Sequence, residues 1–156
     1  MKFTNITIND DLADIINVLN KSHGTVAEEY KFTKDNNPSN NAFIDDATLK
    51  AQIEKGIELY SLSINAETVG CVAIEKSSRE NTLFYIEKVS ILPQFRNKGC
   101  GVKLMDFAIL RITELSGKTI SIGLIDSNIK LKNWYSSQGF VESGTKRFDH
   151  LPFTVC

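Results

Sequence analysis

The feature that most constrains this chain is the segment Pro93–Gly101, which separates the longest strand-like run from the clearest amphipathic helix. The run 82–92 (TLFYIEKVSIL) is rich in β-branched and aromatic residues and stops at Pro93, which cannot donate a hydrogen bond to a sheet. From about 102 to 115, apolar residues recur at helical intervals, and a second strand-like run follows at 119–125. This order predicts a β-α-β crossover with parallel strands.

The rest of the chain adds strands and helices around this crossover. The runs 57–64 and 69–76 are joined by a short polar turn, which is typical of an antiparallel hairpin. Further strands are expected at 2–8, 140–146 and 151–155, and helices at 12–23 (stopping near Gly24), 47–55 and 129–138. The order β-α-α-β-β-β-α-β-α-β-β predicts one domain over 1–156, of mixed α/β class, with helices on both faces of a mixed sheet.

Charge and cysteine usage exclude several classes of protein. Eighteen basic against nineteen acidic residues give a net charge of -1, without the basic excess of a dedicated nucleic-acid binder. No apolar run approaches the length of a membrane helix, and the N-terminus lacks the apolar region of a secretory signal. Cys71, Cys100 and Cys156 lie far apart, and the only histidines are His23 and His150. We therefore expect a cytoplasmic protein with no metal, no nucleic acid and no membrane partner.

The loop before the best helix has the composition of an anion-binding turn. Backbone N–H groups converge where a strand turns into a helix, and the helix dipole adds partial positive charge there. Gly99 and Gly101 allow close approach of the backbone, while Arg96 and Lys98 add counter-charge. On these residues alone, a plain glycine turn remains an equal alternative. A nucleotide-phosphate site is disfavoured, because neither Gly-Lys-Ser/Thr nor the third glycine of a dinucleotide fingerprint is present.

Two motifs extend this interpretation to a family. RNKGCG at 96–101 matches the signature Arg/Gln-x-x-Gly-x-Gly/Ala, and Asn128, Tyr135 and Gly139–Phe140 follow at a matching spacing. With these motifs and the order of its elements, the chain resembles the GCN5-related N-acetyltransferases (GNAT) over essentially its whole length. Asn97 stands where the family usually has glycine, a departure that is tolerable if its φ is negative. The resemblance implies an acyl-CoA N-acyltransferase fold with a mostly antiparallel sheet.

The resemblance also implies where acetyl-CoA is held. The backbone of Val89 and Ile91 would pair with the pantetheine arm, because the family separates its two parallel strands after a bulge near this point. The N–H of Val89 would also face the thioester oxygen, where negative charge develops. Asn128 either hydrogen-bonds CoA or caps its helix. The pyrophosphate contacts would come from Arg96, Asn97, Lys98, Gly99, Cys100, Gly101 and Val102.

Two residues are candidates for the proton transfers. Tyr135 matches the family's proton donor to the departing CoA thiolate; the alternative is a core aromatic residue beside Trp134. Alternation along 83–91 places Glu87 on one strand face with Val89 and Ile91. A carboxylate on an apolar face has a raised pKa, which suits a base that takes a proton from an ammonium group. A carboxylate that reaches solvent or pairs with a lysine is the alternative.

Other reactive side chains are weaker candidates. Cys100 as a nucleophile is disfavoured because the family transfers acetyl directly, and His150 is expected at a strand end or surface. Glu28, Glu29 and Tyr30 lie in the long connection 25–46, which in the family covers the acceptor pocket. They would orient an amine there, or simply form a solvated loop.

The function implied is transfer of acetyl from acetyl-CoA, as cosubstrate, to a primary amine of a small molecule, peptide or protein. The competing hypothesis is a non-catalytic acyl-CoA sensor or interaction module on the same fold; Tyr135 and Glu87 favour the enzyme, since a binder needs neither. We expect acetyl-CoA and an amine acceptor as partners, and a homodimer is compatible with the sequence.

Overall fold

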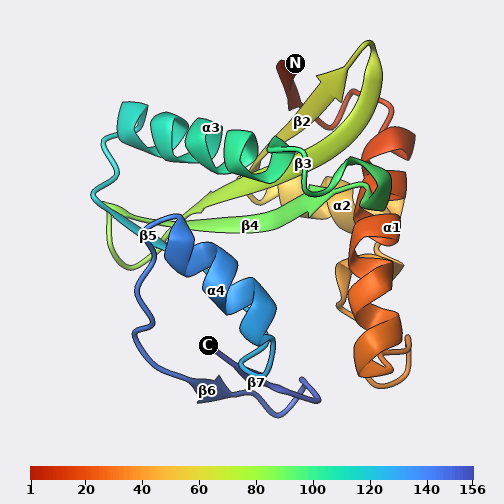
Figure 1. The fold of residues 1–156 in the computed structure, drawn as a ribbon. Coiled ribbons are helices and arrows are strands. Elements are labelled where there is room, and N and C mark those ends of the chain that lie inside the picture. Colours follow the sequence, from red (N-terminus) through yellow and green to blue (C-terminus); the bar gives the residue numbers. More distant parts are fainter.

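A computed structural model describes the whole chain, residues 1–156, as a central sheet with helices packed on both of its faces (Figure 1). In chain order the elements are β1 (Lys2–Ile6), α1 (Ala13–Tyr30), η1 (Asn41–Phe43), α2 (Asp46–Glu54), β2 (Glu58–Ile64), β3 (Glu67–Lys76), β4 (Leu83–Ile91), η2 (Pro93–Phe95), α3 (Cys100–Glu114), β5 (Thr119–Ser121), α4 (Ile129–Ser137), β6 (Lys146–Arg147) and β7 (Thr154–Val155). The predicted order of elements is confirmed. None of the helices combines the length and apolar character that a membrane span requires.

The main sheet has the strand order β1-β2-β3-β4-β5. Its first three pairings are antiparallel, and only β4 and β5 run parallel. The helix α3 connects these two parallel strands, as the crossover predicts. The mixed, mostly antiparallel sheet expected from the resemblance is therefore confirmed.

Each face of the sheet carries its own apolar core, because successive side chains of a strand point to opposite faces. The core under α3 and α4 contains Val72 and Ile74 of β3, whereas Cys71 and Ala73 face α1 and α2. On the first face the helices contribute Leu104, Met105, Ala108, Ile112 and Tyr135; on the second they contribute Leu12, Ile15, Val18, Leu19 and Leu49. Two opposed helical layers thus hold the sheet from both sides.

Helix α1 is longer than the sequence predicts. We expected it to stop near Gly24, but it continues through that residue to Tyr30. The C-terminal cap is Lys31, whose φ of 56° is left-handed, and the N–H of Phe32 bonds the carbonyl of Ala27 at 2.8 Å. Gly24 is thus a helix-interior glycine rather than a cap. The prediction that places Glu28, Glu29 and Tyr30 in a loop is wrong, because they form the last turn of α1.

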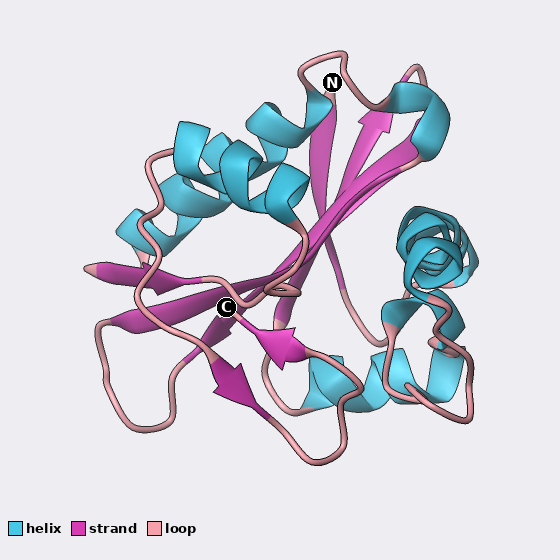
Figure 2. Cartoon of the chain, turned by 60° about the horizontal axis from the view of Figure 1, so that its bottom comes forward, coloured by secondary structure: helices cyan, strands magenta, loops and turns pink.

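The C-terminal strands are shorter than expected and leave the main sheet. The predicted strand 119–125 ends at Ser121, and beyond it Leu124 exchanges backbone hydrogen bonds with Cys156 at 3.0 and 2.8 Å. The predicted strands 140–146 and 151–155 reduce to β6 and β7, which pair with each other outside the five-stranded sheet, and Val155 of β7 also forms an isolated bridge with Ile125. Figure 2 shows this small ribbon apart from the main sheet. The segment that continues β5 leaves β4 and pairs with β7 instead, since the N–H of Asp126 also bonds the carbonyl of Thr154 at 2.9 Å.

Candidate active site

The two parallel strands separate in the middle of the molecule. Pairing of β4 with β5 is confined to Leu83–Tyr85 against Thr119–Ser121. From Ile86 to Ile91, β4 has no strand partner on that side, and Tyr135 of α4 belongs to the same apolar cluster as Ile91. Figure 1 shows α4 below this half of β4, beyond the end of β5. An unpaired strand edge of this kind offers backbone groups to an extended ligand.

A β-bulge lies on this unpaired part of β4. The register with β3 advances from Cys71–Ser90 to Ala73–Glu87, so Lys88 and Val89 together lie opposite Val72. The bulge is built around Lys88, whose φ is +53°. It changes the alternation of side chains: Glu87 faces α1 and α2 with its partner Ala73, whereas Val89 packs in the core under α3.

The expectation that Glu87 shares a face with Val89 and Ile91 is therefore wrong. Alternation along a strand holds only while the pairing is regular, and the bulge at Lys88 interrupts it.

The loop before α3 opens several backbone N–H groups toward solvent. It contains two left-handed residues, Asn97 with φ 59° and Gly99 with φ 80°, and the side chains of residues 97–99 are exposed. No side chain caps α3, so its first N–H groups are free to bind a ligand. The condition of a negative φ at Asn97 is not met. Asparagine fits nevertheless, because it is one of the few residues that adopt the left-handed region readily.

The side chain of Arg96 does not point into this loop as counter-charge, contrary to the sequence-based expectation. Its guanidinium donates to the carbonyl of Ser22 at 2.8 Å and the hydroxyl of Thr25 at 3.1 Å, both on α1, and to the carbonyl of Ile91 at 3.3 Å. Arg96 thereby fastens the loop to α1 and to the end of β4. The free positive charge near the loop is Lys98, whose exposed ammonium lies 5.4 Å from the Phe95 ring.

Gly101 lies at a close contact between two helices. A Cβ at this position would lie 3.0 Å from Cζ2 of Trp134, so α4 packs directly on the first turn of α3. The indole also contacts Tyr135 edge to face, with ring centroids 4.9 Å apart. Trp134 is therefore a packing residue that joins the two helices on either side of the separated strands.

The candidate residues of α4 occupy two different environments. Asn128 caps the helix by accepting from the N–H of Leu131 at 3.1 Å, which is one of the two roles predicted for it. Tyr135 is buried, its exposed fraction is 8%, and burial raises the pKa of its phenol to about 12.

Glu87 carries a perturbed carboxyl group, as the sequence predicts. Burial, together with the neighbouring carboxyl of Glu75, raises its pKa to about 6, while the charge of Lys88 lowers it. The apolar face that we invoked is not the cause, because the bulge places Glu87 on the other face. A carboxyl group with this pKa can accept a proton at neutral pH.

His23 is a site residue that the sequence reasoning missed. Its Nε2 lies 3.0 Å from the hydroxyl of Ser90 on β4, one residue from Val89. Burial, with the positive charges of Lys88 and Arg96, lowers its pKa to about 4, so the ring is neutral at physiological pH. The signal that could have identified His23 is its place in a helix that continues past Gly24. We expected that helix to end near Gly24, so His23 was not considered.

The remaining candidates lie at the rim of the site or outside it. Glu28 and Glu29 are exposed on the last turn of α1. Tyr30 stacks on Phe32, which in turn contacts Phe153 of the C-terminal ribbon with centroids 5.2 Å apart. The end of α1 and the ribbon thus meet beside the separated strands. The side chain of Cys100 is buried in the apolar core under α3, and that of His150 is exposed beside Phe148.

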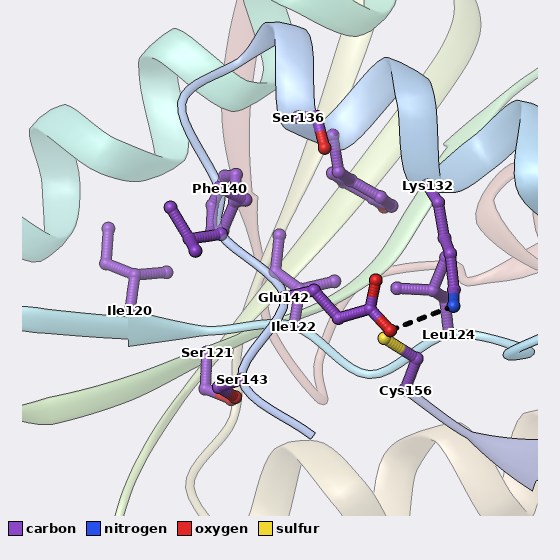
Figure 3. Close-up of a pocket in the computed structure, with 12 residues that line it drawn as sticks. Ile120, Ser121, Ile122, Leu124, Lys132, Ser136, Phe140, Glu142, Ser143 and Cys156 are labelled. Atoms are coloured by element: carbon purple, nitrogen blue, oxygen red, sulfur yellow. Dashed lines mark hydrogen bonds and ion pairs between the residues drawn. The ribbon is translucent and has the colours of Figure 1, made fainter. Parts of the chain in front are cut away.

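A small cavity of about 100 Å³ lies between α4 and the segment that continues β5 (Figure 3). Ile120, Ile122 and Phe140 line one part of it, and Lys132, Glu142 and Cys156 line the other. The side chains of Asp126, Glu142 and Cys156 bring atoms that could ligate a metal ion within 4.8 Å of one another. The ammonium of Lys132 contacts Asp126 and bonds Glu142 at 3.1 Å, so this cluster already has an internal cation.

These features define a class of protein. A mixed sheet whose parallel strands separate beside an open, glycine-containing helix N-terminus has a place for an extended pantetheine arm and for the pyrophosphate at its end. The class is that of acyl-CoA-dependent transferases.

The comparisons with known proteins agree. The model of the acetyltransferase (GNAT) domain family matches residues 28–154, and the chain belongs to this family as an acetyl-CoA-dependent N-acyltransferase. An uncharacterized N-acetyltransferase of Archaeoglobus fulgidus is 26% identical over 133 residues, which cover 83% of this chain and 86% of that protein.

Two solved structures show the same fold. The PaiA N-acetyltransferase of Thermoplasma acidophilum in complex with coenzyme A has a TM-score of 0.76 at 14% identity, over 99% of this chain and 98% of its own. A GNAT family acetyltransferase of Elizabethkingia anophelis with acetyl-CoA bound has a TM-score of 0.65 at 17% identity, over 99% and 92%.

Proposed function

We propose that the protein transfers the acetyl group of acetyl-CoA directly to a primary amine, and that residues 1–156 form one catalytic domain. The observation that carries this proposal is the separation of β4 from β5 directly beside the uncapped N-terminus of α3. A buried phenol, Tyr135, lies on the α3 and α4 face of the sheet, and a carboxyl group of raised pKa, Glu87, lies on the α1 and α2 face. A donor and an acceptor of protons are both required for this reaction.

In the proposed reaction the neutral amine attacks the thioester carbonyl, the carbon–sulfur bond breaks, and an amide and CoA are formed. The backbone N–H of Val89 stabilises the oxygen that gains negative charge, and that of Ile91 helps to hold the pantetheine arm. Glu87, directly or through water, takes the proton that the ammonium group must lose before attack. Tyr135 gives its proton to the leaving thiolate, and the second proton that the nitrogen loses as the amide forms restores the phenol, directly or through water.

Binding of the pyrophosphate is assigned to the backbone of the loop. The open N–H groups of residues 97–102 and the ammonium of Lys98 supply positive potential, and the side chain of Arg96 holds the loop against α1. Asn128 contributes by capping α4, which carries Tyr135. Glu28, Glu29 and Tyr30 lie at the end of α1, where an amine acceptor would enter.

Two experiments test the proposal in order. Thermal unfolding with acetyl-CoA, CoA, ATP or NAD should show stabilisation by the first two only, since a ligand that binds the folded protein stabilises it more as its concentration rises above Kd. A panel of primary amines is then screened for release of CoA thiol from acetyl-CoA. Stabilisation without thiol release for any amine, peptides included, would identify an acyl-CoA binder instead of an enzyme.

A further inference from the structure

The bulge in β4 leaves two oppositely charged neighbours, Glu87 and Lys88, on the same side of the sheet. Glu87 faces α1 and α2 opposite Ala73, and the ammonium of Lys88 reaches Asn41 of η1, a segment that packs on α1. In a regular strand, consecutive side chains point to opposite faces. Neither residue takes part in any of the ion pairs of the molecule, so the two do not pair with each other.

Lys88 is a buried cation without a counter-ion. Its exposed fraction is 9%, and its ammonium, which has three N–H donors, meets one acceptor, Oδ1 of Asn41 at 2.8 Å. The titratable groups around it are the neutral ring of His23, the thiol of Cys71 and the carboxyl groups of Glu75 and Glu87, and none of them forms an ion pair with the ammonium. An ammonium removed from water in this way is costly unless an anion joins it.

The position of this ammonium is fixed by the fold. Lys88 keeps a left-handed backbone, φ +53°, which a residue with a long side chain adopts only when its surroundings impose it. Asn41 is itself held in place, because the side-chain amide of Asn20 on α1 donates to its carbonyl at 3.0 Å. Backbone strain and fixed contacts at one position are typical of a binding group prepared for its ligand.

We propose that Glu87 and Lys88 together select the acceptor, and that the acceptor is an amino acid whose ammonium group faces Glu87 and whose carboxylate binds Lys88. The two charges lie near each other, since the charge of Lys88 lowers the pKa of Glu87 and the charge of Glu87 raises the pKa of Lys88, yet they form no ion pair. Two opposite charges held apart in this way suit an ammonium and a carboxylate joined by a few bonds, as in α- and β-amino acids. This inference rests on the proposed function and adds the substrate class to it.

The test compares amino acids with their carboxamides, which keep the amine and the size but lose the negative charge. Thiol release from acetyl-CoA is measured for the unaltered protein, for Lys88→Met, and for the control Lys21→Met, an exposed lysine of α1. We expect Lys88→Met to lower kcat/KM for amino acids roughly 10–100-fold and for the carboxamides less than about threefold. Lys21→Met should change neither value.

Thermal unfolding separates binding from a structural role. Methionine fills nearly the same space without the uncompensated charge, so Lys88→Met should unfold at the same temperature as the unaltered protein or higher. In the presence of CoA, amino acids should raise the unfolding temperature of the unaltered protein but not that of Lys88→Met.

Three results overturn the inference. In the first, Lys88→Met loses the same factor in kcat/KM with amino acids and with carboxamides. In the second, the unaltered protein uses amino acids and carboxamides equally well. In the third, Lys88→Met is less stable than the unaltered protein and its acceptor preference is unchanged. If the unaltered protein releases thiol with none of the amines, the proposed function itself is overturned. That result needs no variant, so it is distinguished from failure of the inference about Lys88.

Discussion

At the scale of single residues, the buried phenol of Tyr135 carries the clearest mechanistic prediction. Tyr135→Phe removes one oxygen and keeps the ring contacts with Trp134 and Phe140. If the phenol protonates the leaving thiolate, kcat should fall by roughly 10²–10⁴-fold while the affinity for acetyl-CoA changes little. Steady-state kinetics with an acceptor from the amine screen, and calorimetry with acetyl-CoA, measure the two quantities. Turnover at the unaltered rate would remove Tyr135 from the mechanism.

His23 predicts how stability depends on pH. Its pKa in the folded protein is about 4, against an ordinary 6.5, so between these values the unfolded chain binds a proton that the folded protein does not. Stability should therefore fall as the pH is lowered from 6.5 toward 4, by up to about 3 kcal/mol from this group. His23→Gln, which keeps a hydrogen-bonding side chain near Ser90, should show a flatter profile.

Urea unfolding of both proteins at several pH values measures the difference between them. Glu87, whose raised pKa contributes a slope of opposite sign between about pH 6 and 4.5, is present in both and cancels in this comparison. Parallel profiles for the two proteins would show that His23 is protonated in the folded state.

At the scale of elements, helix α1 consists of two differently anchored halves. Its N-terminal half packs through apolar side chains such as Leu12 and Leu19, whereas Ser22, His23 and Thr25 contact β4 and the loop through hydrogen bonds. Gly24 lies inside this helix, and a Cβ there would meet no atom within 4 Å.

Alanine substitutions at two glycines test this description. Gly24→Ala should raise the free energy of unfolding by about 0.5–1 kcal/mol, because a helix-interior glycine loses more backbone entropy than alanine. Gly117→Ala is the matched control: its Cβ would lie 2.3 Å from Cγ2 of Ile112 and 2.8 Å from Cδ2 of Phe84, so roughly 1–3 kcal/mol should be lost. Urea midpoints measure both. Destabilisation by Gly24→Ala would indicate that the helix does not continue through this position.

At the scale of the whole molecule, the sequence predicted what depends on local spacing. Three features were predicted in this way: the helical periodicity after Gly99, the hairpin of β2 and β3, and the Asn128 cap. Each of them depends only on residues that are close to one another in the sequence. The separation of β4 from β5 was expected only through the resemblance to a family. The bulge at Lys88 was not assigned to a residue, because it depends on register with β3.

Contacts between distant segments could not be predicted. The guanidinium of Arg96 binds Ser22, 74 positions away, and the ammonium of Lys88 binds Asn41, 47 positions away. No local pattern distinguishes these side chains from solvated ones. Both contacts lie at the candidate site, so the part of the molecule to which we assign selection of the acceptor is also the part that required the structure.

The most direct test of the central claim is hydrogen exchange of the backbone amides with and without saturating acetyl-CoA. We expect slower exchange concentrated in two segments, 86–91 on β4 and 97–102 at the start of α3, because β4 has no strand partner there on the side away from β3 and no side chain caps α3. Protection at these two segments would place the cosubstrate between the separated strands. Bound acetyl-CoA that leaves both segments unchanged, or that protects the distant hollow between Ile6 and Arg111 instead, would contradict it.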